Sequence, residues 1–131
     1  MARRGGTVAV YVWDHAGGME MMRYFWDVAA AVDPRAAKLD EGRRFPICRA
    51  EALDRLFETN GAFGGIATRA IDVPTVFRNF DDDWTPSLGG RGPAPAYCAS
   101  LADDTRAKLC GRLRARLPES RDGSIDLKAR A

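Results

Sequence analysis

The sequence contains one histidine, three cysteines and no apolar run long enough to cross a membrane. Cys48, Cys98 and Cys110 show no Cys-x-x-Cys spacing, so the sequence predicts neither a disulfide framework nor a zinc site. The apolar run Val8–Trp13 is too short for a secretory signal, and a membrane span needs about 20 apolar residues. We therefore expect a cytoplasmic, reduced protein without a metal and without a membrane partner.

Charge of either sign is not in large excess, since 20 Lys plus Arg face 18 Asp plus Glu in 131 residues. The basic residues are 17 Arg and only 3 Lys, a bias typical of GC-rich bacterial genomes. Arg112, Arg114 and Arg116 spread around a predicted helix instead of forming the stripe that phosphate binding requires. We expect no nucleic-acid partner, and a single domain over residues 1–131.

The apolar spacing predicts an α/β chain. Thr7–Trp13 is continuously apolar and β-branched, which is typical of a strand covered on both faces. Two further strands are predicted at Ile66–Val73 and, from strict alternation, at Ser124–Ala131. Helices are predicted at Met19–Val32, at Ala50–Thr59 before Asn60-Gly61, from Thr75 through Phe77, Phe80 and Trp84, and from Asp103 to Leu117. Leu88–Pro95 is predicted to be a flexible break.

Few residues carry a pattern that indicates chemistry. Asp14 and His15 follow the first predicted strand, where open α/β sheets bind ligands, and a histidine beside a carboxylate can act as a general base. The alternative is a solvated loop histidine. Asp81–Asp83 could hold a divalent cation, but consecutive helical carboxylates point in different directions, so a solvated helix face is favoured. The glycine clusters lack the Gly-x-Gly-x-x-Gly spacing of a cofactor loop and are interpreted as turns.

An ordered series of segments resembles the carboxyl-terminal half of a class I SAM-dependent methyltransferase of the small-molecule type. Arg3-Arg4-Gly5-Gly6-Thr7 resembles the Arg-Pro-Gly-Gly turn before the fifth strand of that family, with Arg4 where proline is usual. Val8–Met22 resembles the fifth strand with its following loop and helix. Leu53–Phe63 resembles the leucine-rich helix, glycine and phenylalanine before the sixth strand, with Ala62 inserted. Gly123–Ala131 resembles the seventh strand.

The resemblance implies a partial Rossmann-like methyltransferase fold. Its three-stranded mixed sheet would have the family order five, seven, six, with about four helices. The family binds S-adenosylmethionine through a glycine-rich loop and an acidic residue that precede the fifth strand, so binding of this cofactor is not expected from this chain alone. The resemblance thus implies a truncated, substrate-side half that transfers a methyl group to a small-molecule acceptor only when the SAM-binding half is supplied.

No residue is assigned a catalytic or SAM-binding role by the resemblance. What it implies is a pocket for the acceptor, with walls from the loop Trp13–Gly18, the following helix and the segment Trp84–Tyr97. The candidate pocket residues are Trp13, Asp14, His15, Met19, Met22, Trp84, Arg91 and Tyr97.

The strand Thr7–Trp13 would lie at an edge of that partial sheet with unpaired backbone groups. Such an apolar edge is a predicted association site, for a second copy or for a partner chain. An alternative function remains open: a noncatalytic α/β module that binds a small apolar ligand or a partner protein. The aromatic run from Met19 to Trp26 could line such a pocket, although such runs are more often core.

Overall fold

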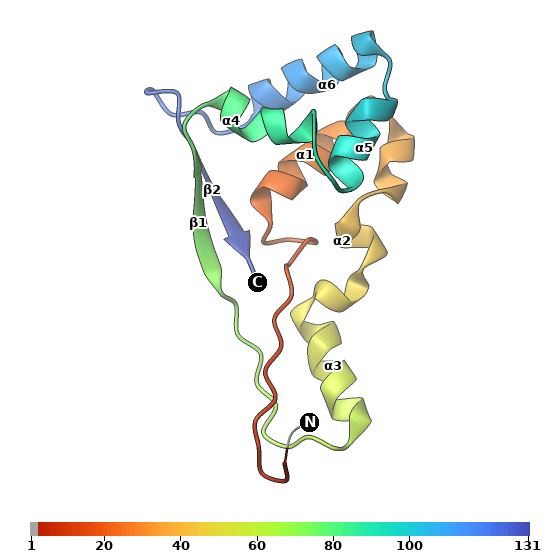
Figure 1. Cartoon of the computed structure of the whole chain (residues 1–131), viewed down its shortest axis with the longest axis vertical. Coiled ribbons are helices and arrows are strands. Elements are labelled where there is room, and N and C mark those ends of the chain that lie inside the picture. Colours follow the sequence, from red (N-terminus) through yellow and green to blue (C-terminus); the bar gives the residue numbers. More distant parts are fainter. Residues whose placement is uncertain (1–2) are drawn as a thin grey trace.

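The computed structural model describes residues 3–131, which form a mixed α/β structure with six α-helices and a two-stranded antiparallel sheet (Figure 1). Three short 3₁₀ turns connect these elements. The helices and strands in chain order are α1 (Glu20–Val32), α2 (Glu41–Arg44), α3 (Ala50–Asn60), β1 (Asp72–Phe77), α4 (Phe80–Trp84), α5 (Pro93–Ser100), α6 (Asp103–Arg116) and β2 (Ile125–Arg130).

The core lies between α1, α6 and one face of the sheet. Strand β2 alternates as expected, with Ile125, Leu127 and Ala129 buried and the residues between them more exposed. α1 packs against both α6 and β2. Its buried face, with Phe25 and Trp26, meets the buried leucines of α6, so the apolar spacing of these two helices predicted the core correctly.

Strand β1 corrects the sequence prediction around Thr75. The helix expected from Thr75 is wrong over Thr75–Phe77, where the backbone is extended and pairs with β2, and is confirmed over Phe80–Trp84, which is α4. Thr75 lies opposite Leu127 and Phe77 opposite Ile125, so both side chains point toward the core face of the sheet. Pairing with a strand distant in sequence therefore overrides the local helical spacing.

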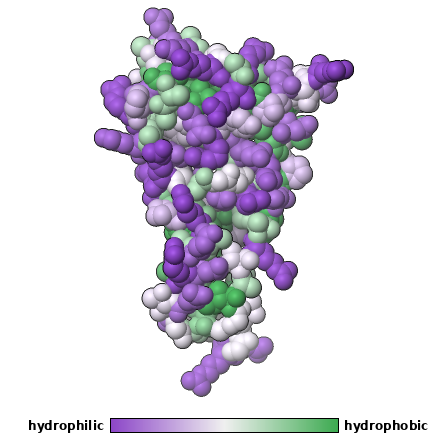
Figure 2. Space-filling model, turned by 180° about the vertical axis from the view of Figure 1, so that it is seen from behind, coloured by the Kyte–Doolittle hydropathy of each residue, from purple (hydrophilic) through white to green (hydrophobic). Residues whose placement is uncertain are grey.

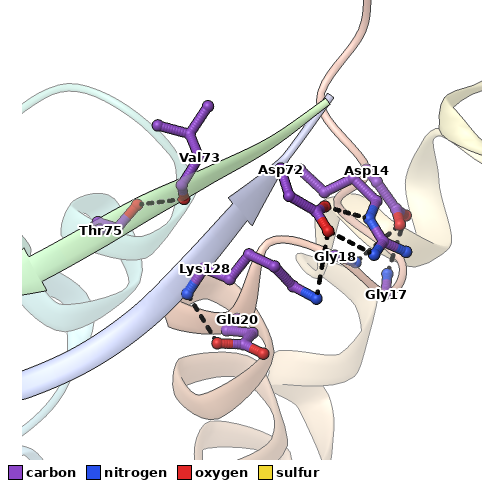
Figure 3. Close-up of polar contacts among 9 residues, drawn as sticks. Asp14, Gly17, Gly18, Glu20, Asp72, Val73, Thr75 and Lys128 are labelled. Carbon is purple, nitrogen blue, oxygen red and sulfur yellow. Dashed lines mark hydrogen bonds and ion pairs between the residues drawn. The ribbon is translucent and has the colours of Figure 1, made fainter. Parts of the chain in front are cut away.

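The expected strand Thr7–Trp13 runs as an extended chain without strand pairing, so a three-stranded sheet is not formed among residues 3–131 (Figure 1). The outer edge of β2 is occupied in another way. The backbone N–H of Lys128 donates to Glu20 Oε2 at 2.7 Å, and the carbonyl of Arg130 accepts from the N–H of Asp14 at 2.8 Å (Figure 3). Because Asp14 is bonded near the end of β2 and the chains run in opposite directions, the apolar run before Asp14 extends past the end of β2 instead of lying alongside it.

Several predicted boundaries are confirmed. α1 ends before Asp33-Pro34, and α3 ends at Asn60, where Gly61 takes the left-handed conformation with φ 67°. The expected count of about four helices is too low, because α2, which is a single turn, and α5 were not predicted. In addition, α5 begins at Pro93, inside the segment expected to be a flexible break. Proline favours the first turn of a helix, which explains this start.

The molecule is a helical body with a long arm. The arm consists of three pieces that leave the body together: the extended residues 3–13, helix α3 and the extended residues 62–71 (Figure 1). Figure 2 shows that the surface is mostly hydrophilic over the body, with an apolar patch at the narrow end. In the described chain, no helix has both the length and the apolarity needed to cross a membrane.

The substitution Gly18→Ala is expected to destabilise the fold. A Cβ at Gly18 would lie 2.7 and 2.9 Å from Cδ and Cγ of Arg130, and it would also press on the Cβ of that residue, which cannot rotate away. We expect a loss of about 1–3 kcal/mol in the free energy of unfolding, measured by urea denaturation.

The matched control is Gly111→Ala on the exposed side of α6, where a Cβ meets no atom within 4 Å. Alanine favours helix over glycine, so this variant should gain up to about 1 kcal/mol. Equal stabilities for the two variants would show that the contact between Gly18 and Arg130 is not tight.

Candidate functional site

An open groove in the arm has a volume of about 1050 Å³. One wall is the extended segment Gly5–Val12 and the other is Ala62–Ile71. Helix α3 contributes Leu53 and Phe57, and Phe57 makes an edge-to-face contact with Phe63 at a centroid distance of 5.3 Å. The groove is thus lined by apolar side chains together with polar and charged ones, which include Arg49, Glu51 and Arg69.

Both walls of the groove are hydrogen-bonded to the end of β2. On one side, the N–H of Asp14 donates to the carbonyl of Arg130. On the other side, Ile71 and Ala131 exchange two backbone hydrogen bonds, with N···O distances of 2.7 and 3.0 Å. The end of β2 therefore lies between the two walls at the head of the groove.

The charged side chains at the head of the groove have hydrogen-bond partners within the chain. The Asp14 carboxylate accepts from the backbone N–H groups of Gly17 at 3.0 Å and Gly18 at 2.7 Å (Figure 3). Arg130 donates to Asp72 through Nε at 2.6 Å and through Nη2 at 3.0 Å. The hydrogen bond from Arg130 holds the pKa of Asp72 below its usual value. Asp14, Asp72 and Arg130 thus each have a hydrogen-bond partner within the chain.

The structure places the sequence-predicted pocket residues in different surroundings. Of the eight, only Asp14 lines the groove. His15 is half-buried in the same loop, and its Nδ1 has no hydrogen-bond partner among the described residues. Trp13 is 43% exposed and Arg91 is exposed, while Met19 and Met22 are half-buried.

Trp84 and Tyr97, expected as walls over an acceptor, belong to the hydrophobic core. Trp84 stacks on Phe80 with a centroid distance of 6.2 Å, and Tyr97 contacts Phe25 and Trp26. The Tyr97 hydroxyl is buried without a hydrogen-bond partner among the described residues, and burial raises its pKa. The structure therefore does not bring Trp84 and Tyr97 to Asp14 in one cavity.

Sequence reasoning missed the second wall and the residues at the head of the groove. Ala62–Ile71 has weak apolar contrast between its two faces, so its local pattern does not identify it as the wall of a cavity. Asp72 and Arg130 are far apart in sequence, and only the antiparallel register places them opposite each other. A signal was available in Gly61–Gly65, because a glycine-rich turn between a helix and an extended segment predicts that the chain reverses direction there.

Cys48 is the one cysteine of this chain that lines the groove. It is half-buried, and burial raises its pKa above the ordinary value. A thiol with a raised pKa is less often present as the nucleophilic thiolate, so Cys48 lacks the electrostatics of a catalytic cysteine. Its role at this site is that of a small apolar lining residue.

The acidic residues Asp81–Asp83 have different surroundings in the structure. The Asp82 carboxylate pairs with Arg78, whose Nη2 lies 3.0 Å away, while Asp83 is partly buried and burial raises its pKa to about 6. In residues 3–131, no group of three or more His, Cys, Asp or Glu side chains is placed to hold a metal ion.

The buried carboxyl of Asp83 gives a pH-dependent prediction. Its folded-state pKa of about 6 lies above the ordinary value of 3.8, so the folded protein prefers the protonated form. Its contribution to stability is therefore complete below pH 4 and is lost as the pH rises through 6. Asp83→Asn should be more stable than the parent at pH 7.5 and about equal at pH 4, measured by thermal unfolding. The control Asp81→Asn, at an exposed position, should show no such pH-dependent difference.

The chain was compared with protein families, with curated proteins and with solved structures. No family model, no curated protein and no solved structure matches it.

Proposed function

We propose that this chain forms the acceptor-side part of a class I SAM-dependent methyltransferase that acts on a small molecule. The observation that carries the proposal is the order of three segments at the end of β2. Asp14 follows the run Thr7–Trp13 and is hydrogen-bonded to one edge of β2. Ile71 leads into β1 and is hydrogen-bonded to the other edge. β2 lies in the middle and runs antiparallel to β1, the same order that the resemblance implies for strands five, seven and six.

The described residues do not fit S-adenosylmethionine itself. The candidate turn for a cofactor is the loop before α1, but its Gly17 and Gly18 N–H groups already donate to the Asp14 carboxylate. Gly18 also packs against Arg130, which leaves no room for a ligand. Under this proposal, another polypeptide segment binds the cofactor, and residues 3–131 bind and orient the methyl acceptor.

The groove determines the class of acceptor. Its walls and α3 present apolar side chains, the Asp14 carboxylate accepts two backbone hydrogen bonds and Arg130 pairs with Asp72, while Arg49, Glu51 and Arg69 also line the groove. An uncharged, largely apolar acceptor would displace water from this surface with a favourable free energy.

Calorimetric titration with S-adenosylmethionine tests the division of roles. The 131-residue chain alone should show no saturable binding. The DNA that adjoins the Met1 codon should encode, in frame or as a neighbouring gene, a strand followed by Gly-x-Gly-x-Gly. Joined to that segment, the chain should bind the cofactor and transfer its methyl group.

Two results would contradict the proposal. Micromolar binding of S-adenosylmethionine by the chain alone would show that these residues hold the cofactor themselves. Absence of the glycine-rich segment from the adjoining DNA, or a joined protein that binds no cofactor, would remove the methyltransferase assignment.

The second candidate function is a noncatalytic module that binds a small apolar ligand or a partner protein. It is favoured by the groove itself, whose volume of about 1050 Å³ lies at the upper end of ligand sites. It needs no cofactor, no metal and no general base.

Binding of the neutral apolar fluorophore N-phenyl-1-naphthylamine tests this candidate. Phe57→Ala should weaken binding by about twofold to tenfold, because an aromatic contact contributes about 0.5–1.5 kcal/mol. The neighbouring Leu56→Ala serves as the control, since Leu56 is 55% exposed and does not line the groove. Equal weakening by both variants would place the fluorophore elsewhere.

A further inference from the structure

The two walls of the groove continue the hydrogen-bonding pattern of β2 beyond its last residue. Along an extended chain, the N–H and C=O groups of alternate residues point to the same side. Asp14 bonds β2, so Val12, Val10 and Val8 direct their backbone groups to the side on which β2 lies. On the second wall, Ile71 is hydrogen-bonded to Ala131. Arg69, two residues earlier, therefore also directs its backbone groups toward the line of β2.

These backbone groups have no partners in the structure. Among residues 3–131, the backbone of 7–12 and of 62–70 makes no hydrogen bond with the rest of the chain. The two walls leave the body on either side of the end of β2, and among residues 3–131 no strand pairs with either of them there. By the alternation given above, unpaired donors and acceptors on both walls point toward the line of β2. In a complete sheet, the N–H and C=O groups of neighbouring strands are hydrogen-bonded to each other. The two walls therefore resemble the outer strands of a sheet that lacks its middle strand.

The side chains beside the groove match an apolar strand. Val10 is 57% exposed, Ile71 is 56% exposed and Phe63 is 40% exposed, and all belong to residues that line the groove. From the third side, α3 presents Leu53 and Phe57. A strand whose alternate residues are apolar would cover these side chains while its backbone bonds both walls.

We propose that the groove binds an extended apolar polypeptide segment of a partner protein as a strand, in line with β2 and antiparallel to both walls. The head of the groove sets the direction, because β2 itself enters between Asp14 and Ile71 and is antiparallel to β1. The proposal takes its site from the second candidate function, names the partner as an extended polypeptide, and is independent of methyl transfer.

A small apolar molecule is the weaker occupant for a physical reason. It could cover the side chains of the groove, but it has no repeating donors and acceptors with which to satisfy both rows of backbone groups. An extended peptide rises about 3.3 Å per residue, the same as the walls, so its amides stay in register with theirs.

The test uses the capped peptide acetyl-Lys-Val-Thr-Val-Thr-Val-Lys-amide, in which valines alternate and the lysines give solubility. We expect saturable binding by calorimetry. The same peptide with proline at its central valine should bind at least about fivefold more weakly, because the substitution removes a donor of about 1 kcal/mol.

A matched pair of variants tests the direction of the backbone groups. Val10→Pro removes an N–H that faces the groove, whereas Tyr11→Pro removes one that faces away, and both side chains are well exposed. Val10→Pro should weaken peptide binding by about fivefold or more, while Tyr11→Pro should change it by less than twofold. Hydrogen exchange followed by NMR should slow on peptide binding at Val8, Val10 and Val12, and not at Ala9 or Tyr11.

Three results would overturn the proposal. One is equal binding of the parent and proline-containing peptides, which would indicate nonspecific apolar adsorption. Another is equal loss of binding in the two proline variants. The third is a chain that sediments as a dimer, slows exchange at the same amides without peptide and binds no peptide, since a second copy would then fill the groove. Failure of peptide binding with retained, Phe57-dependent fluorophore binding would remove this inference and leave the second candidate function standing.

Discussion

The backbone at the end of β2 is hydrogen-bonded on both of its edges, and the position of the arm depends on this arrangement. One edge pairs with β1 and, through Ala131, with Ile71. The other edge bonds Asp14 and the Glu20 carboxylate, which also fixes the start of α1. Because Asp14 bonds Arg130 near the end of β2 and the two chains run in opposite directions, the apolar run Thr7–Trp13, which precedes Asp14, lies beyond the end of β2. The run is thus directed past the end of the sheet, where it forms a wall of the groove.

Helix α3, one of the three pieces of the arm, is positioned by two carboxylates buried beside α1. Trp26 Nε1 donates to Glu41 Oε2 at 2.6 Å, and Arg23 donates to Asp40, which also accepts from the N–H of Gly42. Buried carboxylates are tolerated only when such donors are present, so these bonds fix α2 against α1. α2 in turn leads into α3, which forms the third side of the groove. The groove is therefore shaped by contacts made in the body, at residues that do not line it.

Most of the long helices and strand β2 could be predicted from the sequence, because their signals are local. The apolar spacing of α1 and α6, the stop at Gly61 and the alternation of β2 each depend on neighbours along the chain. The helix expected from Thr75 failed over Thr75–Phe77 because pairing with β2 is not encoded locally. The site was predictable only in part: Asp14 was identified from its place after an apolar run, whereas Trp84 and Tyr97 carry the same aromatic character whether they line a pocket or fill a core. Only the packing distinguishes those two roles.

The three tryptophans of this chain divide between the two parts of the molecule. Trp26 and Trp84 are buried in the core, whereas Trp13 lies at the junction of body and arm with 43% of its surface exposed. A water-soluble quencher such as iodide or acrylamide will therefore reach Trp13 first. The quenchable fraction of the emission reports on the junction, and the protected fraction reports on the core. The protein thus carries two intrinsic optical probes, so events in the arm and in the body can be followed separately without a label.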